Sequence, residues 1–432
     1  TKPLGRCPCG KPLSVHYDWE GIEEDIDVKT DDHSLWRYKR VLPNVEKEDI
    51  VSLGEGWSPL IPMADHIFIK DETVNPTGSF KDRGMAMAVT MAKAQGVESI
   101  CLPSAGNAGV SAAAYCQKAG IDCHVFLPET IPDSFTKATD QYGANIILEG
   151  QTISHAAHKM LESKEENWFD ISTLKEPFRV EGKKSLGYEV AEQMNWELPD
   201  VIIYPTGGGT GLIGMWKAFQ EMKGLGWISG PLPRMVAAQS DGCSPVVKAF
   251  QGMEKSTEFW DKSNTIALGL NVPGPLGGNW MLHVLSECNG IAVSAKESDL
   301  EKATEDFKKM SNIHASPEAG VVWSAYHSLK NRGWIGLNEK VVLFGTVVIG
   351  VFTQAFAGLA ALIAAVPLIG PLIVKVFAIP FFWLLNALGY FVGAVAIKKG
   401  YRTEFTKSRV LTLALLTGII IGYIIGHLVP MR

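Results

Sequence analysis

Short apolar runs alternate with amphipathic stretches between residues 51 and 346, and each run ends in a turn of glycine or other small residues. Runs of this length, bounded by such turns, are typical of buried parallel strands. Seven of them stand at 67–70, 99–102, 123–127, 145–148, 201–204, 235–238 and 341–344. Helical patterns lie between several runs, at 86–95, 109–119 and 212–222. This alternation predicts an α/β fold with an open sheet, whose ligands bind beyond the carboxyl ends of the strands.

The pattern changes within a few residues after Thr346. Charged residues are absent from three stretches, 344–366, 376–397 and 410–429. Each is about long enough to cross a ~30 Å hydrocarbon core at about 1.5 Å per residue, so we predict a membrane tail of about three transmembrane helices. The segment 398–409, between the second and third spans, carries five basic residues and one acidic residue and would face the cytoplasm under the positive-inside rule.

Charge divides the chain at the same place. The first 340 residues hold 33 basic and 45 acidic side chains, whereas the last 92 hold seven basic and one acidic. An acidic body without a stripe of clustered Lys or Arg argues against nucleic-acid binding. Seven scattered cysteines, with no apolar leader near the first residue, predict a reduced and cytoplasmic body that the tail anchors in a membrane.

The first 50 residues are polar, with an acidic run at 20–32, and we predict an N-terminal extension that wraps or caps a body at 51–346. Cys7 and Cys9 resemble half of a zinc knuckle. The usual spacing is C-x-x-C, however, and a closed site needs a second pair, which is absent nearby. An unliganded turn is therefore the favoured interpretation, with structural metal as the alternative, and residues 347–432 form the predicted tail.

The most informative segment, 70–84, reads Lys-Asp-Glu-Thr-Val-Asn-Pro-Thr-Gly-Ser-Phe-Lys-Asp-Arg-Gly. Asn-Pro-Thr-Gly forces a turn, and the following Ser-Phe-Lys enters a helix, so Lys81 can reach into a cleft. A desolvated cleft also favours the neutral amine that a nucleophilic lysine needs. The segment resembles the lysine segment of fold-type II pyridoxal-phosphate enzymes, and most closely that of threonine synthases. The resemblance implies that Lys81 holds the cofactor as a Schiff base and that the preceding Phe80 contacts it.

A second segment opens a predicted helix after the strand at 99–102. By the same resemblance, Ser104, Ala105 and Gly106 would bind the substrate carboxylate, and Asn107 would hydrogen-bond the phenolic oxygen of the cofactor. Exposed amides at a helix N-terminus suit an anion in any case. Small-residue helix starts are common, so a plain turn is the alternative interpretation.

A third segment, Tyr-Pro-Thr-Gly-Gly-Gly-Thr-Gly at 204–211, again joins a strand to a helix. Its glycines let backbone amides close around a phosphate, and the helix dipole adds to the attraction. A dinucleotide-binding loop is the rival, but the G-x-G-x-x-G spacing and its acidic partner are not convincingly present. We therefore predict that the cofactor phosphate binds to Gly207, Gly208, Gly209, Thr210 and Gly211.

Two further stretches, 53–60 and 178–187, extend the resemblance to threonine synthases. In that family the arginine before Glu-Gly helps to hold the substrate phosphate, which implies Arg179 and, less directly, Lys184. A surface ion pair is the alternative role. The stretch 172–177 departs from the asparagine-containing sequence expected of enzymes that use phosphohomoserine, which leaves the substrate open but not the cofactor.

Thr346 closes the set of predicted site residues. Fold-type II enzymes place a neutral Ser or Thr beside the pyridine nitrogen, and Thr346 follows the strand at 341–344 as that pattern requires. The glycine turn and the last soluble helix of the family are missing. A spanning helix cannot begin one residue beyond a cleft, so either several residues after 346 run through the soluble part or the cleft is incomplete.

The resemblance implies a fold-type II, tryptophan synthase beta-like enzyme of two α/β subdomains, followed by an all-α transmembrane segment. The implied lyase reaction converts O-phosphohomoserine and water to threonine and phosphate, with pyridoxal 5'-phosphate as cofactor and no metal. Dehydration of threonine or serine, and β-replacement on a phosphorylated amino acid, are alternatives with the same cofactor. A membrane-anchored module that no longer binds cofactor is an alternative of another class. Relatives of this fold are commonly dimers, which allows a homodimer.

Overall fold

The structure is a computed structural model that describes residues 5–20, 28, 31–313 and 315–345. Thr346, the predicted spans 376–397 and 410–429, and all but the first two residues of the span 344–366 lie outside this part of the chain. Within the described ranges, no helix is both long and apolar enough to cross a bilayer.

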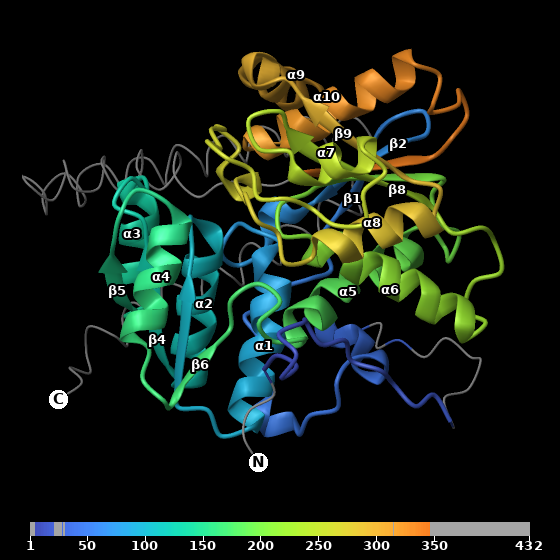
Figure 1. The fold of residues 1–432 in the computed structure, drawn as a ribbon. Helices are drawn as coiled ribbons and strands as arrows, with labels where there is room; N and C mark the ends of the chain where they lie inside the picture. Colours follow the sequence, from blue (N-terminus) through green and yellow to red (C-terminus); the bar gives the residue numbers. More distant parts are fainter. Residues whose placement is uncertain (1–4, 21–27, 29–30, 314, 346–432) are drawn as a thin grey trace, which may run out of the picture. The chain divides into compact units, whose positions relative to one another are not determined.

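Six strands form the larger sheet, in the order β1-β2-β10-β7-β8-β9 (Figure 1). Their bounds are Leu60–Ala64 (β1), Ile67–Asp71 (β2), Val341–Gly345 (β10), Val201–Pro205 (β7), Arg234–Ser240 (β8) and Ile291–Ala295 (β9). Strand β1 runs antiparallel to β2, and the other neighbouring pairs are parallel. Leu343 lies opposite Ile69 of β2 on one side and Ile203 of β7 on the other. The carboxyl ends of these three strands therefore meet at one edge of the sheet.

Four parallel strands form the smaller sheet, in the order β5-β4-β3-β6. They are Asn145–Leu148 (β5), Asp122–Leu127 (β4), Ser99–Pro103 (β3) and Trp168–Asp170 (β6). Three helices pack with this sheet: α2 (Asn107–Ala119), α3 (Asp133–Asp140) and α4 (Ile153–Ser163). The smaller sheet and its helices form a part of their own beside the larger sheet (Figure 1).

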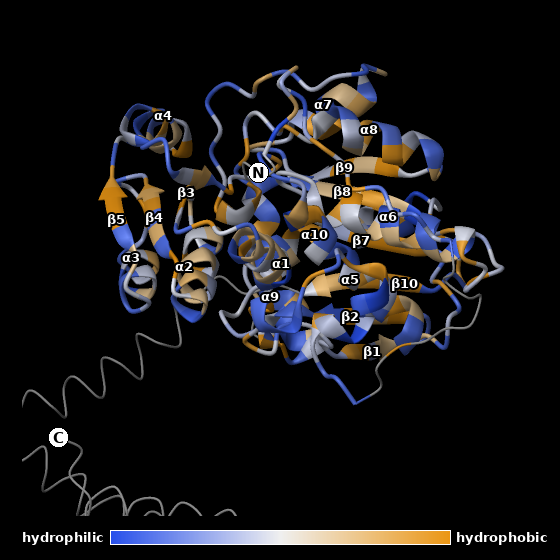
Figure 2. Ribbon diagram, turned by 90° about the horizontal axis from the view of Figure 1, so that it is seen from below, coloured by the Kyte–Doolittle hydropathy of each residue, from blue (hydrophilic) through white to orange (hydrophobic). Residues whose placement is uncertain are grey.

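Helices cover both faces of the larger sheet. One face packs with α5 (Phe178–Gln193), α6 (Thr210–Gly224), α7 (Pro245–Gln251) and α8 (Gly278–Glu287). The other face packs with α9 (Leu300–Ser311) and α10 (Pro317–Asn331). Helix α1 (Lys81–Ala94) contacts both α2 and α5, so it joins the two sheets through their helices (Figure 2).

Strand β10 shows why the first predicted span began too early. Val342 and Phe344 belong to one apolar cluster, and Val341 and Leu343 belong to the cluster on the opposite face. A strand buried on both faces is as apolar as a membrane helix, so hydropathy alone cannot separate the two. Because β10 ends at Gly345, the prediction of a span starting at Phe344 is wrong at its first two residues.

The seven predicted strands are confirmed, and each lies within β2, β3, β4, β5, β7, β8 or β10. The three helical patterns lie in or overlap α1, α2 and α6. Strands β1, β6 and β9 were missed. The first contains Pro62 at the sheet edge, the second has only three half-buried residues, and Ser294 interrupts the third, so none forms a continuous apolar run.

Part of the N-terminal extension lies within the core. A short 3-10 helix, η1 (Leu35–Val41), buries Leu35 and Tyr38 against α5. The ring of Tyr38 stacks on that of Tyr188 with centroids 5.5 Å apart, and Arg37 forms an ion pair with Glu192. The segment therefore contributes to the same hydrophobic core as α5.

Candidate active site

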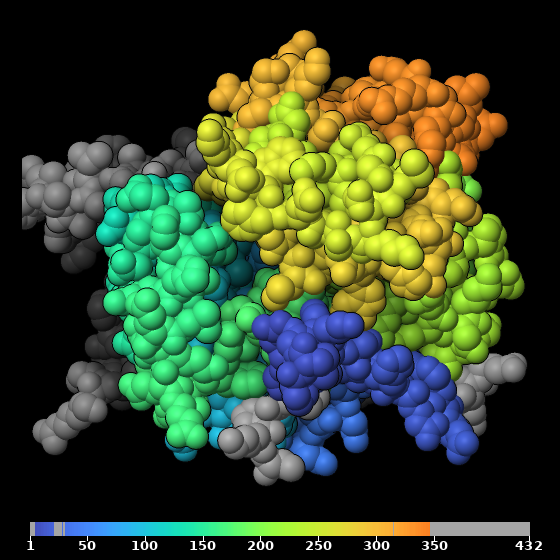
Figure 3. Space-filling view, in the orientation of Figure 1, coloured from blue at the N-terminus to red at the C-terminus, as the bar shows by residue number. Residues whose placement is uncertain are grey.

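A cavity lies where the carboxyl ends of β3 and β7 approach the start of α1. The starts of α1 and α2, the loop after β7 and the segment 268–272 form most of its lining. The lining residues are Phe80, Lys81, 103–108, Phe135, Ile153, Thr173, Arg179, 204–205, 207–211, 268–272 and Glu318. The surface is hollowed between the smaller-sheet part and the part that contains α7 (Figure 3). Of the predicted site residues that the structure describes, all but Lys184 line this cavity.

Lys81 is the first residue of α1, and the turn before it is locked by Asp82. The Asp82 carboxylate accepts hydrogen bonds from the Thr77 amide at 2.7 Å and from the Ser111 hydroxyl at 2.6 Å. Burial lowers the pKa of Lys81 to about 8, the charge of Arg179 acts in the same direction, and Glu318 opposes them. The neutral Lys81 amine, the form that acts as a nucleophile or base, is therefore far more populated near neutral pH than in an ordinary lysine.

The ring of Phe80 lies between two lysines. The Nζ atoms of Lys81 and Lys183 are 4.5 Å and 3.8 Å from its centroid, respectively. Lys183 also donates a hydrogen bond to the Phe80 carbonyl, and burial, followed by the charge of Lys81, lowers its pKa well below the ordinary value. Sequence reasoning missed Lys183, although it stands beside Lys184 in the same motif.

The turn after β3 and the first residues of α2 line the cavity. The Ser104 hydroxyl accepts hydrogen bonds from the amides of Gly106 at 3.1 Å and Gly109 at 2.9 Å, which holds the turn closed as α2 begins at Asn107. Ala105 lies between them and also lines the cavity. This geometry leaves a helix N-terminus directed at the cavity, a position that favours a carboxylate.

An added Cβ would clash most severely at two glycines of the loop after β7. Gly209 has φ of 89°, and a Cβ there would lie 2.5 Å from the Met281 sulfur. A Cβ at Gly211 would lie 2.0 Å from the Tyr204 hydroxyl. Because α6 begins at Thr210, the loop delivers backbone amides and the positive end of a helix dipole to the cavity, which together suit a phosphate group.

Four buried polar atoms that face this cavity have no hydrogen-bond partner within the described residues. They are Arg179 Nε, Tyr204 Oη, Asn271 Oδ1 and Glu318 Oε2. Buried polar groups in folded proteins are nearly always paired, so such a concentration indicates a polar ligand. A reactive lysine, a glycine cradle and unpaired polar atoms are the features that a pyridoxal phosphate site requires, and these residues fit that group.

Arg179 and Lys184 lie on different sides of α5. The Arg179 guanidinium faces the cavity and donates to the Ile171 carbonyl at 3.0 Å; burial lowers its pKa, and the nearby Glu176 opposes this. Lys184 does not line the cavity, and its Nζ is 3.0 Å from Glu181 and 3.0 Å from Glu221. Five residues along an α-helix turn a side chain by about 140°, which explains the separation. The prediction of Lys184 as a substrate ligand is not supported by its position.

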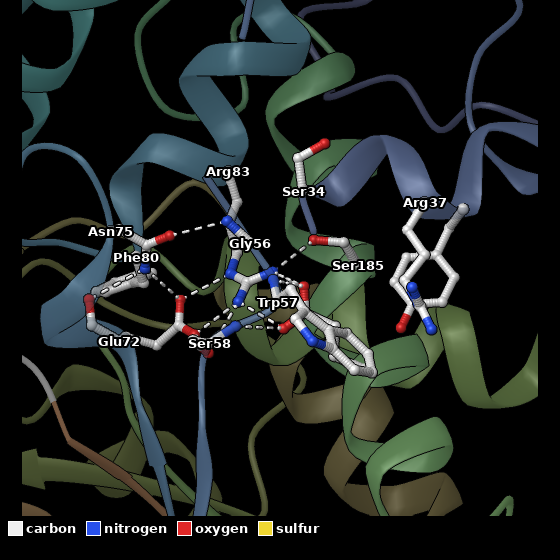
Figure 4. A network of polar contacts seen from close by, with 12 residues as sticks. Ser34, Arg37, Gly56, Trp57, Ser58, Glu72, Asn75, Phe80, Arg83 and Ser185 are labelled. Carbon is white, nitrogen blue, oxygen red and sulfur yellow. Dashed lines mark hydrogen bonds and ion pairs between the residues drawn. The ribbon is translucent and has the colours of Figure 1, made fainter. Parts of the chain in front are cut away.

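A network of buried charged residues that pair with one another surrounds Arg83 near the start of α1 (Figure 4). Arg83 pairs with Glu72 at 2.7 Å and with Glu189 at 2.5 Å, and Lys70 pairs with Glu189 at 2.7 Å. Each of these side chains is 0% exposed. Burial alone would raise the pKa of Glu189, but Arg83 and Lys70 lower it to about 2. Sequence reasoning gave these motif residues no role, and the network joins β2, α1 and α5.

The N-terminal cysteines form no metal site with other described residues. The Sγ atoms of Cys7 and Cys9 are 2.7 Å apart. Across the described ranges, no group of three or more His, Cys, Asp or Glu side chains could hold a metal ion.

Comparisons with known proteins agree with this geometry. Residues 51–346 match the family model described as pyridoxal-phosphate dependent enzyme. The threonine synthase of Methanocaldococcus jannaschii is 30% identical over 352 residues, covering 79% of this chain and 87% of the relative. That of Methanosarcina acetivorans is 31% identical over 349 residues, covering 78% and 85%.

Solved structures share the fold at low identity. Maize serine racemase superposes with a TM-score of 0.59 at 19% identity, covering 71% of this chain and 92% of that one. A fungal L-serine ammonia-lyase from Rhizomucor miehei gives 0.60 at 20% identity, covering 69% and 96%.

Proposed function

Because this chain belongs to the pyridoxal-phosphate dependent enzymes, with a fold-type II α/β fold and a threonine synthase-like function, we propose that it converts O-phosphohomoserine and water to threonine and phosphate. One observation carries the proposal: unpaired buried polar atoms surround the cavity that contains Lys81 and the glycine loop. Such a cavity suits a ligand with several charged groups.

We assign the cofactor to the residues that already fit it. Lys81 would bind its carbonyl carbon through Nζ, the amides of 207–211 would hold its phosphate, and Phe80 and Asn107 would contact the ring. Thr346, the expected partner of the ring nitrogen, lies outside the described residues. The bound cofactor supplies an electron sink for negative charge that develops at the substrate Cα.

The remaining cavity residues would bind and orient the substrate. The turn formed by Ser104, Ala105 and Gly106 suits the carboxylate, since it lines the cavity directly before the N-terminus of α2. Arg179 suits the phosphate, because its Nε is buried and unpaired among the described residues. Lys81, once freed by the incoming amino group, would take the proton from Cα, and burial favours the neutral amine that this step needs.

The overall conversion balances without a further reactant. The bond between Cγ and the phosphate oxygen breaks, water supplies a hydroxyl at Cβ, and the protons that Lys81 and the water supply complete the product. Phosphate leaves as the second product. The cavity residues contribute by holding the reacting groups and moving protons rather than by covalent chemistry of their own, apart from the bond at Lys81.

The sequence at 172–177 lacks the asparagine expected of enzymes that use phosphohomoserine. This difference favours reactions on other substrates as the second candidate function. The alternatives are dehydration of serine or threonine, and β-replacement on a phosphorylated amino acid. Both would use Lys81 in the same way, and both would place the substrate carboxylate at the turn after β3.

The test starts with the purified protein and added pyridoxal phosphate. Wild type should develop visible absorbance that Lys81→Ala abolishes, and Lys93→Ala, on the same helix but outside the cavity, should leave it unchanged. O-phosphohomoserine should release phosphate and yield threonine. Turnover of serine, threonine or O-phosphoserine instead would replace the proposed substrate, and absence of the chromophore would overturn the enzyme assignment.

We also propose the cellular arrangement that the sequence predicts, a cytoplasmic catalytic part joined to a membrane tail at 347–432. The absence of charge from the three predicted spans supports it. Full-length protein should sediment with membranes and be released by detergent but not by high salt. A variant ending at residue 346 should then stay in the supernatant. Crosslinking of the full chain tests whether a homodimer forms.

A further inference from the structure

One carboxylate faces the cavity, and the proposed assignment does not use it. Among the described lining residues, Glu318 is the only acidic side chain, and it shares the cavity with two basic side chains, Lys81 and Arg179. It stands in the first turn of α10 and is 4% exposed. A buried carboxylate in a cavity that must accept phosphate repels its ligands unless a cation faces it.

The two oxygens of Glu318 have different surroundings. Oε1 accepts a hydrogen bond from the Gly269 amide at 2.7 Å, which fixes the side chain against the segment 268–272. Oε2 is buried and lacks a hydrogen-bond partner in the part of the chain that the structure describes. The first oxygen therefore positions the carboxylate, and the second is available to a cationic group in the cavity.

Two basic groups and one phenol share the cavity with Glu318. Lys81 reaches it from α1, Arg179 from α5 and Tyr204 from β7. Arg179 already donates to the Ile171 carbonyl and is assigned to the substrate phosphate. Lys81 is the group whose charge must change during the reaction, and Glu318 raises the pKa of Lys81 against burial and against Arg179.

We propose that Glu318 is a positioning residue that stabilises the protonated form of Lys81 in the cavity; this inference rests on the proposed function. When Lys81 takes the proton from Cα, its amine becomes an ammonium in the cavity that also contains the charge of Arg179, which opposes that change. Glu318 supplies the one opposite charge among the described lining residues. The proton later returns from Lys81 to the reacting molecule, and no proton has to pass through Glu318.

The test compares Glu318→Gln with Glu318→Asp in the purified protein loaded with pyridoxal phosphate. Gln keeps an oxygen for the Gly269 amide and removes the charge, whereas Asp keeps the charge on a shorter side chain. The visible absorbance of the lysine-bound cofactor should titrate about one pH unit or more lower in Glu318→Gln, because a carboxylate no longer favours the protonated nitrogen. With the substrate, kcat should fall about tenfold or more while KM changes less than about threefold, and Glu318→Asp should recover part of both losses.

Glu55→Gln is the matched control. Glu55 is also fully buried and also has one oxygen without a partner among the described residues, but it does not line the cavity. It should leave the absorbance titration unchanged. An unchanged midpoint in Glu318→Gln would overturn the proposal, and so would an equal shift in Glu55→Gln.

The proposed substrate can fail separately. If the midpoint shifts in Glu318→Gln while wild type releases no phosphate from O-phosphohomoserine, the role of Glu318 stands and the substrate assignment fails. If wild type shows no visible cofactor absorbance, both proposals fail.

Discussion

Lys81 and Arg83 are two residues apart on one helix and belong to two differently organised groups of buried charge. Two helical positions differ by about 200°, so the two side chains leave α1 in opposite directions. Arg83 enters a network in which each cation contacts a carboxylate. Lys81 enters a cavity that contains Arg179 and Glu318, each with one polar atom that lacks a partner among the described residues.

The difference separates two uses of buried charge. Paired charges such as Arg83 and Glu72 satisfy one another, so they hold segments together without any ligand. Unpaired groups such as Arg179 Nε keep an unfavourable desolvation free energy that a ligand can offset on binding. Pairing between opposite charges, more than burial, therefore distinguishes the ion network of Arg83 from the cavity of Lys81. Substitutions in the two groups should have opposite effects on stability and on ligand binding.

The largest expected effect is on stability in the network. Arg83→Met leaves Glu72 and Glu189 buried beside one another, which should reduce the free energy of unfolding by about 3–5 kcal/mol. Urea denaturation at pH 7 measures this loss in the free energy of unfolding. Arg234→Met is the control, since its partly exposed pair with Glu339 should be worth less than about 1 kcal/mol. Equal losses in the two variants would contradict a structural role for the network.

The next largest effect should appear in the cavity, on cofactor binding. Gly209→Ala must adopt positive φ, and its Cβ would lie 2.5 Å from the Met281 sulfur, so the glycine loop or Met281 has to shift. We expect cofactor affinity to fall about 100-fold, measured from absorbance during titration with pyridoxal phosphate. Gly224→Ala, at the end of the same helix with nothing within 4 Å of the added Cβ, should bind like wild type. Similar affinities in both variants would remove the loop from the cofactor site.

The sequence predicted the parts of this comparison that depend on local pattern. Turn residues and a helix start placed Lys81 correctly at the beginning of α1, and strand-loop-helix patterns located both the turn at 104–107 and the glycine loop. Glu318 escaped notice, because it lies over 230 residues from Lys81 in the chain and no motif marks it. The sequence predicted Lys184 to lie at the substrate site, whereas it pairs with Glu181 and Glu221 outside the cavity. The motif alone does not indicate which side of α5 each residue faces.

A substitution of Arg179 tests the prediction that unpaired charges of the cavity contribute to binding rather than to stability. Arg179→Met removes a buried cation with an unpaired nitrogen, so the free energy of unfolding should change by less than about 1 kcal/mol. KM for the phosphorylated substrate should rise about 10- to 30-fold. Lys184→Met should do the reverse, because that ammonium is paired with Glu181 and Glu221 outside the cavity. A loss of stability in Arg179→Met as large as that in Lys184→Met would show that both residues belong to the scaffold.

The smallest expected effect concerns Glu55, a buried carboxylate with no ion pair among the described residues. Burial raises the pKa of Glu55 to about 7. At Glu189 the charges of Arg83 and Lys70 outweigh burial and lower the pKa. In the unfolded chain a glutamate ionises near about 4.3. Between these values the unfolded chain releases a proton that the folded chain keeps, so ionisation favours unfolding, and stability should fall as the pH rises from about 4.5 to about 7.

Glu55→Gln removes this ionisation while keeping an oxygen that can accept from the Tyr115 hydroxyl, as Glu55 does at 2.8 Å. The variant should be more stable than wild type by on the order of 1 kcal/mol at pH 8 and no more stable at pH 4.5, as measured by urea denaturation at both values. Part of the slope should remain, because burial also raises the pKa of Glu176 to about 7. If Glu55→Gln is equally stabilised at both pH values, the gain comes from packing rather than from ionisation. The stability difference between buried carboxylates such as Glu55 and Glu189 would then come from packing. The contrast between paired and unpaired buried charge would hold for the cavity but not for Glu55.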